Sequence, residues 1–206
     1  MIRTNGDGRK FATKPVAHKM SSRSATHAGS WYSNDRAKLA GELAGWLDEA
    51  QVTCGRARAI IAPHAGYSYS GPTAAWAYKH INPTGIRRVF LLGPSHHVHS
   101  SRCLLTACTE YSTPLGPLQV DQQASDALRQ TGLFDDMPRK TDEDEHSLEM
   151  HLPYLFTVMQ GQSFTLVPVL VGALSEANEA VYGALFAGAR AHNLALCLSL
   201  SPRPPP

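Results

Sequence analysis

The chain has 206 residues, of which 43% are hydrophobic, and its formal net charge is +2. That length and composition suit one globular domain with a sizeable core and exclude a chain that is disordered throughout. Residues 1–24 carry six bases and one acid, whereas the rest of the chain carries 13 bases and 16 acids. Because the basic excess belongs to one end, we expect no nucleic-acid-binding face on the domain.

Composition divides the chain into three predicted segments. Residues 1–24 form a basic, polar extension without an apolar run, which we expect to be disordered. Residues 25–200 form the predicted α/β domain, and residues 201–206 are a proline-rich tail. The four cysteines show no CxxC spacing, which favours reduced thiols in an intracellular protein. We therefore expect the protein in the cytoplasm and also in the nucleus. No apolar run is long enough to span a bilayer, so we expect no membrane span.

The first predicted helix follows a short polar stretch in which Ser33 or Asn34 is the expected N-cap. Apolar residues then recur at spacings typical of one face of a helix: Leu39, Leu43, Trp46, Leu47 and Ala50. We therefore expect this stripe, including Trp46, to pack into the core.

A strand–helix–strand unit is predicted next. The apolar runs Ala59–Ala62 and 89–92 end at Gly or Pro, as buried strands do, and residues 72–81 between them form a predicted helix that begins at a proline. Such a crossover makes the two strands parallel, so both end at the sheet edge where open α/β folds bind ligands. His64 follows the first strand and His96 follows the second.

These two histidines are candidate metal ligands. Neighbouring strands lie about 4.8 Å apart and a metal–nitrogen bond is about 2.0–2.1 Å long, so imidazoles from such strand ends can meet at one ion. A single histidine at a strand end is more often a hydrogen-bonded loop residue. Two at equivalent strand ends, each beside a proline, make a shared site about as reasonable as that structural alternative.

Short elements follow this unit. Residues 103–108 and 118–120 are two predicted strands about a turn, and residues 121–128 are a predicted helix that ends before a Thr-Gly pair.

The acidic run that begins at Thr141 has two interpretations. Its carboxylates could form a hard-cation site, but they also fit a helix start in which Thr141 is the cap and Asp144 completes a capping box. We prefer the helix start because such sequences are common. His146 and Glu149 follow on one predicted helix face, and a zinc-peptidase pattern fails because Met150 stands where a second histidine is needed.

The last predicted elements are a buried strand at 164–171, a helix at 175–191 and a strand at 194–200. Pro168 within the first of these indicates an edge strand or a bulge. The repeated alternation predicts an α/β fold with a mixed, largely parallel sheet and helices on both faces.

Five stretches in the same order resemble signature sequences of the Memo-like family (mediator of cell motility). They are THAGSWY at 26–32, APHAGYSYSG at 62–71, GPSHH at 93–97, TDEDEHSLEMHLPY at 141–154 and VPVLVGALSE at 167–176. The family is structurally related to class III extradiol dioxygenases, which are non-haem iron enzymes. The resemblance therefore implies a fold of the class III extradiol dioxygenase type that is incomplete in this chain.

The resemblance also implies roles for individual residues. His64 and His96 become metal ligands of an iron or copper site, and Trp31, Tyr69 and His97 become contacts for a bound ligand. Simple core packing is the alternative for Trp31. The acidic block is then a supporting element, with structural or supporting roles for its members His146, Glu149 and His151.

The chain departs from the family after the last predicted strand. There the relatives continue into an Asp-x-x-His-Trp block and later provide a cysteine ligand, whereas this sequence reads SPRPPP at 201–206. A mononuclear iron site of this class needs an anionic ligand beside two histidines. With no third ligand at a matching position, we expect iron or copper to bind weakly.

Three functions compete. The resemblance implies a metal-binding protein in growth-factor-receptor signalling to the cytoskeleton and in cell motility, with a phosphopeptide or receptor tail as partner. The first alternative is a non-haem iron extradiol-type dioxygenase or another iron- or copper-dependent oxidoreductase acting on a small aromatic ligand. The second is a non-functional truncated isoform. We rank the signalling protein first because a complete catalytic set is missing from the sequence.

Overall fold

The computed structural model describes residues 19–189 and 194–199. A main sheet has the strand order β2-β9-β3-β8-β4-β7, and a small sheet has the order β1-β5-β6. The main sheet consists of Ala59–Ala62 (β2), Arg88–Pro94 (β3), Cys103–Thr106 (β4), Phe134–Met137 (β7), Thr165–Val171 (β8) and Leu194–Ser199 (β9). The small sheet consists of Ser22–Arg23 (β1), Glu110–Tyr111 (β5) and Leu118–Gln119 (β6). The helices are Arg36–Glu49 (α1), Tyr67–Tyr78 (α2), Gln122–Arg129 (α3), Arg139–Asp144 (α4), His146–Glu149 (α5), Leu152–Val158 (α6) and Glu176–Ala189 (α7).

The main sheet is mixed and largely parallel, which confirms the predicted fold class. β3 pairs in parallel with β8 and β9, β2 with β9, and β4 with β7, whereas β4 pairs with β8 in the antiparallel sense. Parallel strands need crossover connections: α2 lies between β2 and β3 in the chain and α7 between β8 and β9, and each connection passes over one intervening strand. The architecture is consistent with the Memo-like, dioxygenase-type fold that the resemblance implies.

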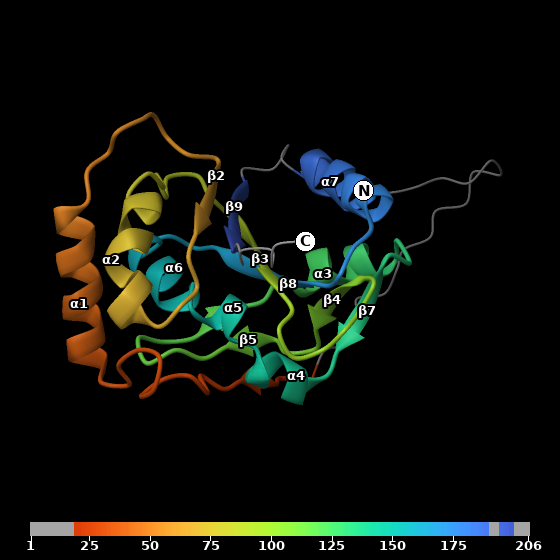
Figure 1. Cartoon of the computed structure of the whole chain (residues 1–206), viewed down its shortest axis with the longest axis horizontal. Helices are drawn as coiled ribbons and strands as arrows, with labels where there is room; N and C mark the ends of the chain where they lie inside the picture. The colour runs from red at the N-terminus through yellow and green to blue at the C-terminus, as the bar shows by residue number, and fades with distance from the viewer. Residues whose placement is uncertain (1–18, 190–193, 200–206) are drawn as a thin grey trace, which may run out of the picture.

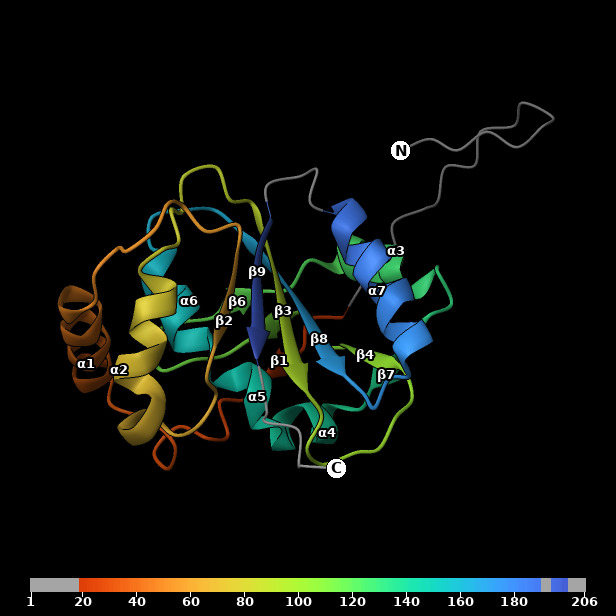
Figure 2. The same ribbon diagram turned by 45° about the horizontal axis from the view of Figure 1, so that its top comes forward.

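Helices cover both faces of the main sheet (Figures 1 and 2). On one face α1, α2, α5 and α6 contribute to the larger core, and on the other α3 and α7 contribute to the smaller one. The side chains of β3 alternate between these cores, with Val89 and Leu91 in the larger and Phe90 and Leu92 in the smaller. A strand that is buried on both faces is apolar at successive positions, which is why this run predicts a strand so clearly.

β8 lies inside the sheet, so the edge position expected from Pro168 is wrong. The backbone N–H of Thr165 donates to Arg87 on the β3 side, and the alternation of the strand then directs the nitrogen of Pro168 toward β4. The described pairing with β4 covers Val169 and Leu170. Pro168 lies just outside it, so its missing N–H interrupts none of the described pairs.

α2 begins at Tyr67, five residues before the predicted start, and contains Pro72. The backbone N–H of Tyr67 donates to the carbonyl of Trp31 at 2.8 Å, which fixes the first turn. Within the helix, Pro72 cannot donate to the carbonyl of Ser68. Ser68 is exposed, so water can satisfy that carbonyl and the helix continues. Tyr69, which precedes the predicted helix start at residue 72, therefore lies on α2.

The cap of α1 also differs from the prediction. The side chain of Asp35, and not that of Ser33 or Asn34, accepts the hydrogen bond from the backbone N–H of Lys38 at 2.8 Å. Asp121, the first residue of the predicted helix, caps α3 in the same way, and the helix itself begins one residue later.

The acidic run is not the start of one helix. The chain there forms α4, α5 and α6 in succession, and Thr141 lies inside α4, whose N-cap is Pro138. Asp142 is buried and accepts hydrogen bonds from the hydroxyls of Thr106 and Tyr111, at 2.6 Å and 2.7 Å respectively. The carboxylate of Asp142 is therefore an internal hydrogen-bond acceptor. The predicted helix start, with Thr141 as its cap, does not account for this role.

Residues 22 and 23 belong to the folded domain, although the predicted boundary lay at residue 25. β1 pairs with β5, and the side chain of Arg23 is fully buried. Its guanidinium contacts Asp142 at 3.1 Å and Glu149 at 2.6 Å, so a charge that is costly to bury is paired on both sides. This network ties the N-terminal strand to the acidic block. The predicted extension up to residue 18 and the proline-rich tail lie outside the described residues.

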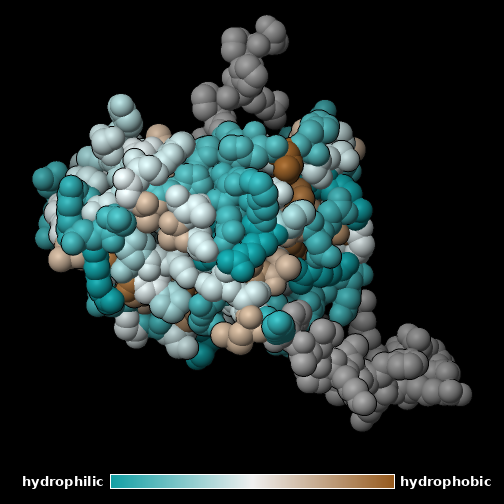
Figure 3. All heavy atoms as spheres, turned by 90° about the horizontal axis from the view of Figure 1, so that it is seen from below, coloured by the Kyte–Doolittle hydropathy of each residue, from teal (hydrophilic) through white to brown (hydrophobic). Residues whose placement is uncertain are grey.

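The face seen from below in Figure 3 is mostly hydrophilic, and the hydrophobic residues drawn on it are scattered. Among the helices within residues 19–189, none combines the length and apolar character that a membrane crossing requires.

Candidate metal centre

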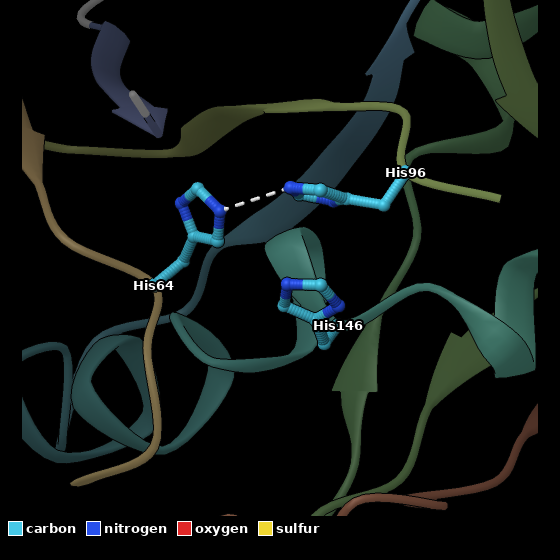
Figure 4. Close-up of side chains that lie close together, drawn as sticks. All are labelled: His64, His96 and His146. Carbon is cyan, nitrogen blue, oxygen red and sulfur yellow. Dashed lines mark hydrogen bonds between the residues drawn. The ribbon is translucent and has the colours of Figure 1, made fainter. Parts of the chain in front are cut away.

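His64 and His96 come together although their strands are not neighbours. β9 lies between β2 and β3, so the expectation of adjoining strands is wrong. Two strand spacings are about 10 Å, and the side chains reach across that gap. The Nε2 atoms of His64 and His96 lie 3.4 Å apart (Figure 4).

His146 adds a third imidazole to this pair. One ligand atom from each of the three residues lies within 4.8 Å of the others, and Figure 4 shows the ring of His146 beside both partners. His146 begins α5, where the chain leaves α4. The sequence predicts a site that lacks an anionic third ligand, and that expectation stays a prediction. The break between α4 and α5 presents a third nitrogen, to which the sequence assigned only a supporting role. We call His64, His96 and His146 the histidine cluster.

The geometry of the cluster fits a transition-metal ion. Two nitrogens that each bind a metal at about 2.0–2.1 Å with a tetrahedral angle lie about 3.4 Å apart, which is the separation of the Nε2 atoms of His64 and His96. His64 is 8% exposed, whereas the side chains of His96 and His146 are 29% and 14% exposed. The cluster is therefore partly open, and a ligand can approach it from the side of His96.

Glu145 fixes the orientation of His96. Its carboxylate accepts hydrogen bonds from Nδ1 of His96 at 2.8 Å and from the backbone N–H of His96 at 2.7 Å, and it also caps α5 through the N–H of Ser147. Burial alone would raise the pKa of Glu145, but these hydrogen bonds outweigh burial and lower that pKa. Because the carboxylate accepts from the Nδ1–H, Nε2 is the ring nitrogen that lies toward His64, 3.4 Å from Nε2 of His64, and His96 has the tautomer that a metal ligand needs.

The other two members of the cluster are held in the neutral form. Burial, with a smaller contribution from His96, lowers the pKa of His64, and the same two causes lower the pKa of His146 to about 4. Ligation requires an imidazole without its second proton. At neutral pH His64 and His146 therefore need to lose no proton before a cation binds.

A second carboxylate–imidazole pair lies beside the cluster. Glu149 accepts hydrogen bonds from Nδ1 of His27 at 2.8 Å, from the backbone N–H of His27 at 2.9 Å and from the hydroxyl of Tyr32 at 2.8 Å. The ring of Trp31 stacks on that of His146, with centroids 4.4 Å apart and 30° between the planes. Sequence reasoning did not single out His27, although THAGSWY contains it and Trp31 together.

The remaining predicted site residues lie in different settings. The ring of His97 is edge-on to that of His146, with centroids 6.3 Å apart, so it lies at the rim of the cluster. The side chain of Tyr69 is 85% exposed on α2. His151 is 1% exposed, and its Nδ1 is 2.7 Å from the hydroxyl of Tyr78. Ligand contacts for His97 and Tyr69 stay predictions, and the surroundings of His151 are those of a core residue.

Comparisons with known proteins find the same family that the sequence stretches around this site resemble. The family model described as Memo-like protein matches residues 23–199. Protein MEMO1 of Danio rerio is 53% identical over 172 residues, which are 82% of this chain and 58% of that protein. Protein MEMO1 of Homo sapiens is 51% identical over 173 residues, 83% of this chain and 58% of that protein. Protein memo-1 homolog of Caenorhabditis elegans is 50% identical over 165 residues, 80% and 47% respectively. The chain thus spans about half the length of these relatives.

Proposed function

Because the chain belongs to the Memo-like family, we propose that it is a metal-binding protein of that family, with the histidine cluster as its iron or copper site. The observation that carries this proposal is the convergence of three imidazole nitrogens within 4.8 Å. The carboxylate of Glu145 behind His96 supports it, because metal-bound histidines commonly donate their other N–H to such a group.

The donor set favours copper over iron. Imidazole suits copper, zinc and iron, and among divalent ions copper binds a given nitrogen site most tightly. Non-haem Fe(II) oxygenases instead use two histidines and one carboxylate. In the described part of the chain the carboxylate of Glu145 is engaged on Nδ1 of His96 and is not a third member of the cluster. This arrangement supports a binding role more than an extradiol-type dioxygenase.

The biological setting of the proposal is the one that the family resemblance implies. We place the protein in growth-factor-receptor signalling to the cytoskeleton and in cell motility, in the cytoplasm and also the nucleus. Its partner in this proposal is a phosphopeptide or receptor tail. Because the chain spans about half the length of its relatives, the metal site and the partner site are proposed separately.

Metal content tests the proposal directly. The full chain, freed of metal by chelation and dialysed against equal Cu(II), Fe(II) and Zn(II), should retain about one ion per chain, with copper in excess. The double variant His64→Ala/His96→Ala should retain none, and His146→Ala should lower the affinity without abolishing binding. Elemental analysis and competition titration against a chelator measure both quantities.

A matched control separates the cluster from histidines in general. His99 is exposed and lies outside the cluster, so His99→Ala should retain as much metal as the unchanged chain. Equal metal content in the double variant and in the unchanged chain would rule out the proposed site.

A further inference from the structure

The helix that begins with His146 is too short to hold its own position. α5 has four residues, His146–Glu149, and follows the break at Glu145. A helix of about one turn is unstable by itself, because its few hydrogen bonds do not offset the entropy lost in fixing the backbone. The place of His146 in the histidine cluster therefore depends on contacts from other parts of the chain, and one set of these comes from the N-terminal strand.

One guanidinium of that strand spans α5 from end to end. Nη2 of Arg23 donates to the carbonyl of Glu145, the N-cap of α5, at 2.9 Å. Nη1 of Arg23 donates to the carboxylate of Glu149, the last residue of α5, at 2.6 Å. Nε of Arg23 donates to the carbonyl of Asp142 in α4 at 3.0 Å. Because a guanidinium presents its donors in a fixed plane, this buried side chain sets α4 and both ends of α5 relative to one another.

The loop after β1 holds the same helix. The backbone N–H of His27 donates to the carboxylate of Glu149 at 2.9 Å, and the ring of Trp31 stacks on that of His146 with centroids 4.4 Å apart. Figure 2 shows β1 beside α4 and α5. The N-terminal strand and its loop thus contact α5 at its first residue and at its last.

Few hydrogen bonds attach β1 to the rest of the small sheet. β1 has two residues and lies at the edge of that sheet. The backbone N–H of Ser112 donates to the carbonyl of Arg23 at 2.9 Å, and the backbone N–H of Thr109 donates to the carbonyl of Ser21 at 2.8 Å. A short edge strand of this kind can open locally while the main sheet stays folded. When β1 opens, α5 loses the guanidinium that joins its two ends.

We propose that Arg23 is a positioning residue of the metal site, so that docking of β1 and metal binding at the histidine cluster favour each other. Docked β1 holds His146 beside His64 and His96, and an ion bound by His146 holds α5 where Arg23 meets its acceptors. The coupling is reciprocal: the factor by which docking raises the metal affinity is the factor by which the ion suppresses undocking. Supporting contacts of a metal site change its affinity about 10- to 100-fold. This inference rests on the proposed metal site and adds the segment that regulates it.

Hydrogen exchange at the backbone N–H of Ser112 measures the undocking of β1. The full chain is compared without metal and with zinc well above its dissociation constant, zinc being redox-inert. Zinc should slow the exchange of Ser112 about 10- to 100-fold, the range given by the reciprocal coupling. Unchanged exchange at full zinc content would overturn the coupling and leave the metal site intact. A chain that retains no zinc would refute both the metal site and the coupling.

The variant His146→Ala separates this coupling from a general stabilisation of the fold. It keeps His64 and His96 and is measured at the same ratio of zinc to its own dissociation constant. Undocking of β1 then no longer changes the metal site, so zinc should leave the exchange of Ser112 unaltered. A ligand that only stabilises the fold suppresses unfolding by a factor set by that ratio alone. Equal protection in the variant and in the unchanged chain would therefore overturn the coupling.

The variant Arg23→Lys tests the guanidinium itself. Lysine keeps the charge, but a single ammonium cannot span both ends of α5, so the zinc affinity should fall about tenfold or more. Arg88→Lys is the matched control. Arg88 is also partly buried and pairs with Asp121 at 2.6 Å, but it begins β3, whereas His96 follows the end of that strand. Competition titration against a chelator should show no change in Arg88→Lys, and equal affinities in the two variants would overturn the role of Arg23.

Discussion

The carboxylate of Glu145 accepts hydrogen bonds from two parts of the chain, the start of α5 and His96. Its oxygens bind the backbone N–H of Ser147, which starts α5, and both the ring and the backbone of His96, which follows β3. The start of α5 and the orientation of His96 are therefore coupled. Because His146 is the first residue of α5, the same carboxylate also positions the third imidazole of the cluster.

Replacing Glu145 by Gln tests this coupling at the level of one residue. The amide keeps the volume but loses the charge that favours the Nδ1–H form of His96, so the metal affinity should fall about 10- to 100-fold. Competition titration against a chelator measures the change. Asp144→Asn is the matched control, since Asp144 is partly exposed and pairs with Lys140, and it should leave the affinity unaltered. Equal affinities for the two variants would show that Glu145 does not orient the ligand.

The same residues show how far sequence reasoning reaches. His64 and His96 follow apolar runs that predict strands, so their convergence at one sheet edge could be predicted. His146 follows the break between α4 and α5, and at that break Glu145 accepts long-range hydrogen bonds from His96. His27 donates in the same way to Glu149. Neither contact leaves a local pattern, because the partners are more than 40 residues apart in the sequence.

At the level of elements, α1 and α2 pack closely because α2 has a glycine at the contact. A Cβ atom on Gly71 would lie 2.5 Å from the ring of Trp46, which is partly buried against the larger core. The stripe predicted from the sequence thus does carry Trp46 to the core, but only a residue without a side chain leaves room for the indole.

Gly71→Ala should therefore destabilise the protein, although alanine favours helices by about 1 kcal/mol over glycine. Overpacking of a core contact costs about 1–3 kcal/mol, so the net loss of unfolding free energy should be up to about 2 kcal/mol. Gly45→Ala in α1 is the control, because nothing lies within 4 Å of its added Cβ, and it should stabilise the protein. Urea unfolding measures both variants. If both were stabilising, the contact between the helices would not limit the packing.

Elements were predictable where their apolar pattern was strong and were missed where tertiary contacts decide. β2 has its predicted bounds. β3 contains the predicted run 89–92, and β8 begins one residue after the predicted start of the run 164–171. β7 was missed because its sequence, Phe134–Met137, contains two adjacent aspartates and resembles a loop. α2 begins earlier than predicted because Trp31, distant in the sequence, accepts a hydrogen bond from its first residue.

At the scale of the whole molecule, histidines enclosed by the fold make stability depend on pH. Burial lowers the pKa of His151 to about 3, and it lowers the pKa of His146 to about 4. In the unfolded chain both residues titrate near pH 6.5. Below that value the unfolded state takes up protons that the folded state does not, so the free energy of unfolding falls as pH decreases from about 6.5 toward 4.

Each such histidine contributes a slope of about 1.4 kcal/mol per pH unit once the unfolded state is fully protonated. Urea unfolding of the metal-free chain at several values between about pH 7 and pH 4.5 should therefore show a steady loss of stability. His151→Asn removes one of these groups, and its amide can still bond to the hydroxyl of Tyr78, which lies 2.7 Å from Nδ1 of His151. The variant should be less stable at neutral pH because it leaves a cavity. The slope of its unfolding free energy against pH should be smaller by the contribution of one proton, about 1.4 kcal/mol per pH unit. An identical slope in the two proteins would mean that His151 is protonated in the folded state, and the buried, neutral imidazole beside Tyr78 would have to be abandoned.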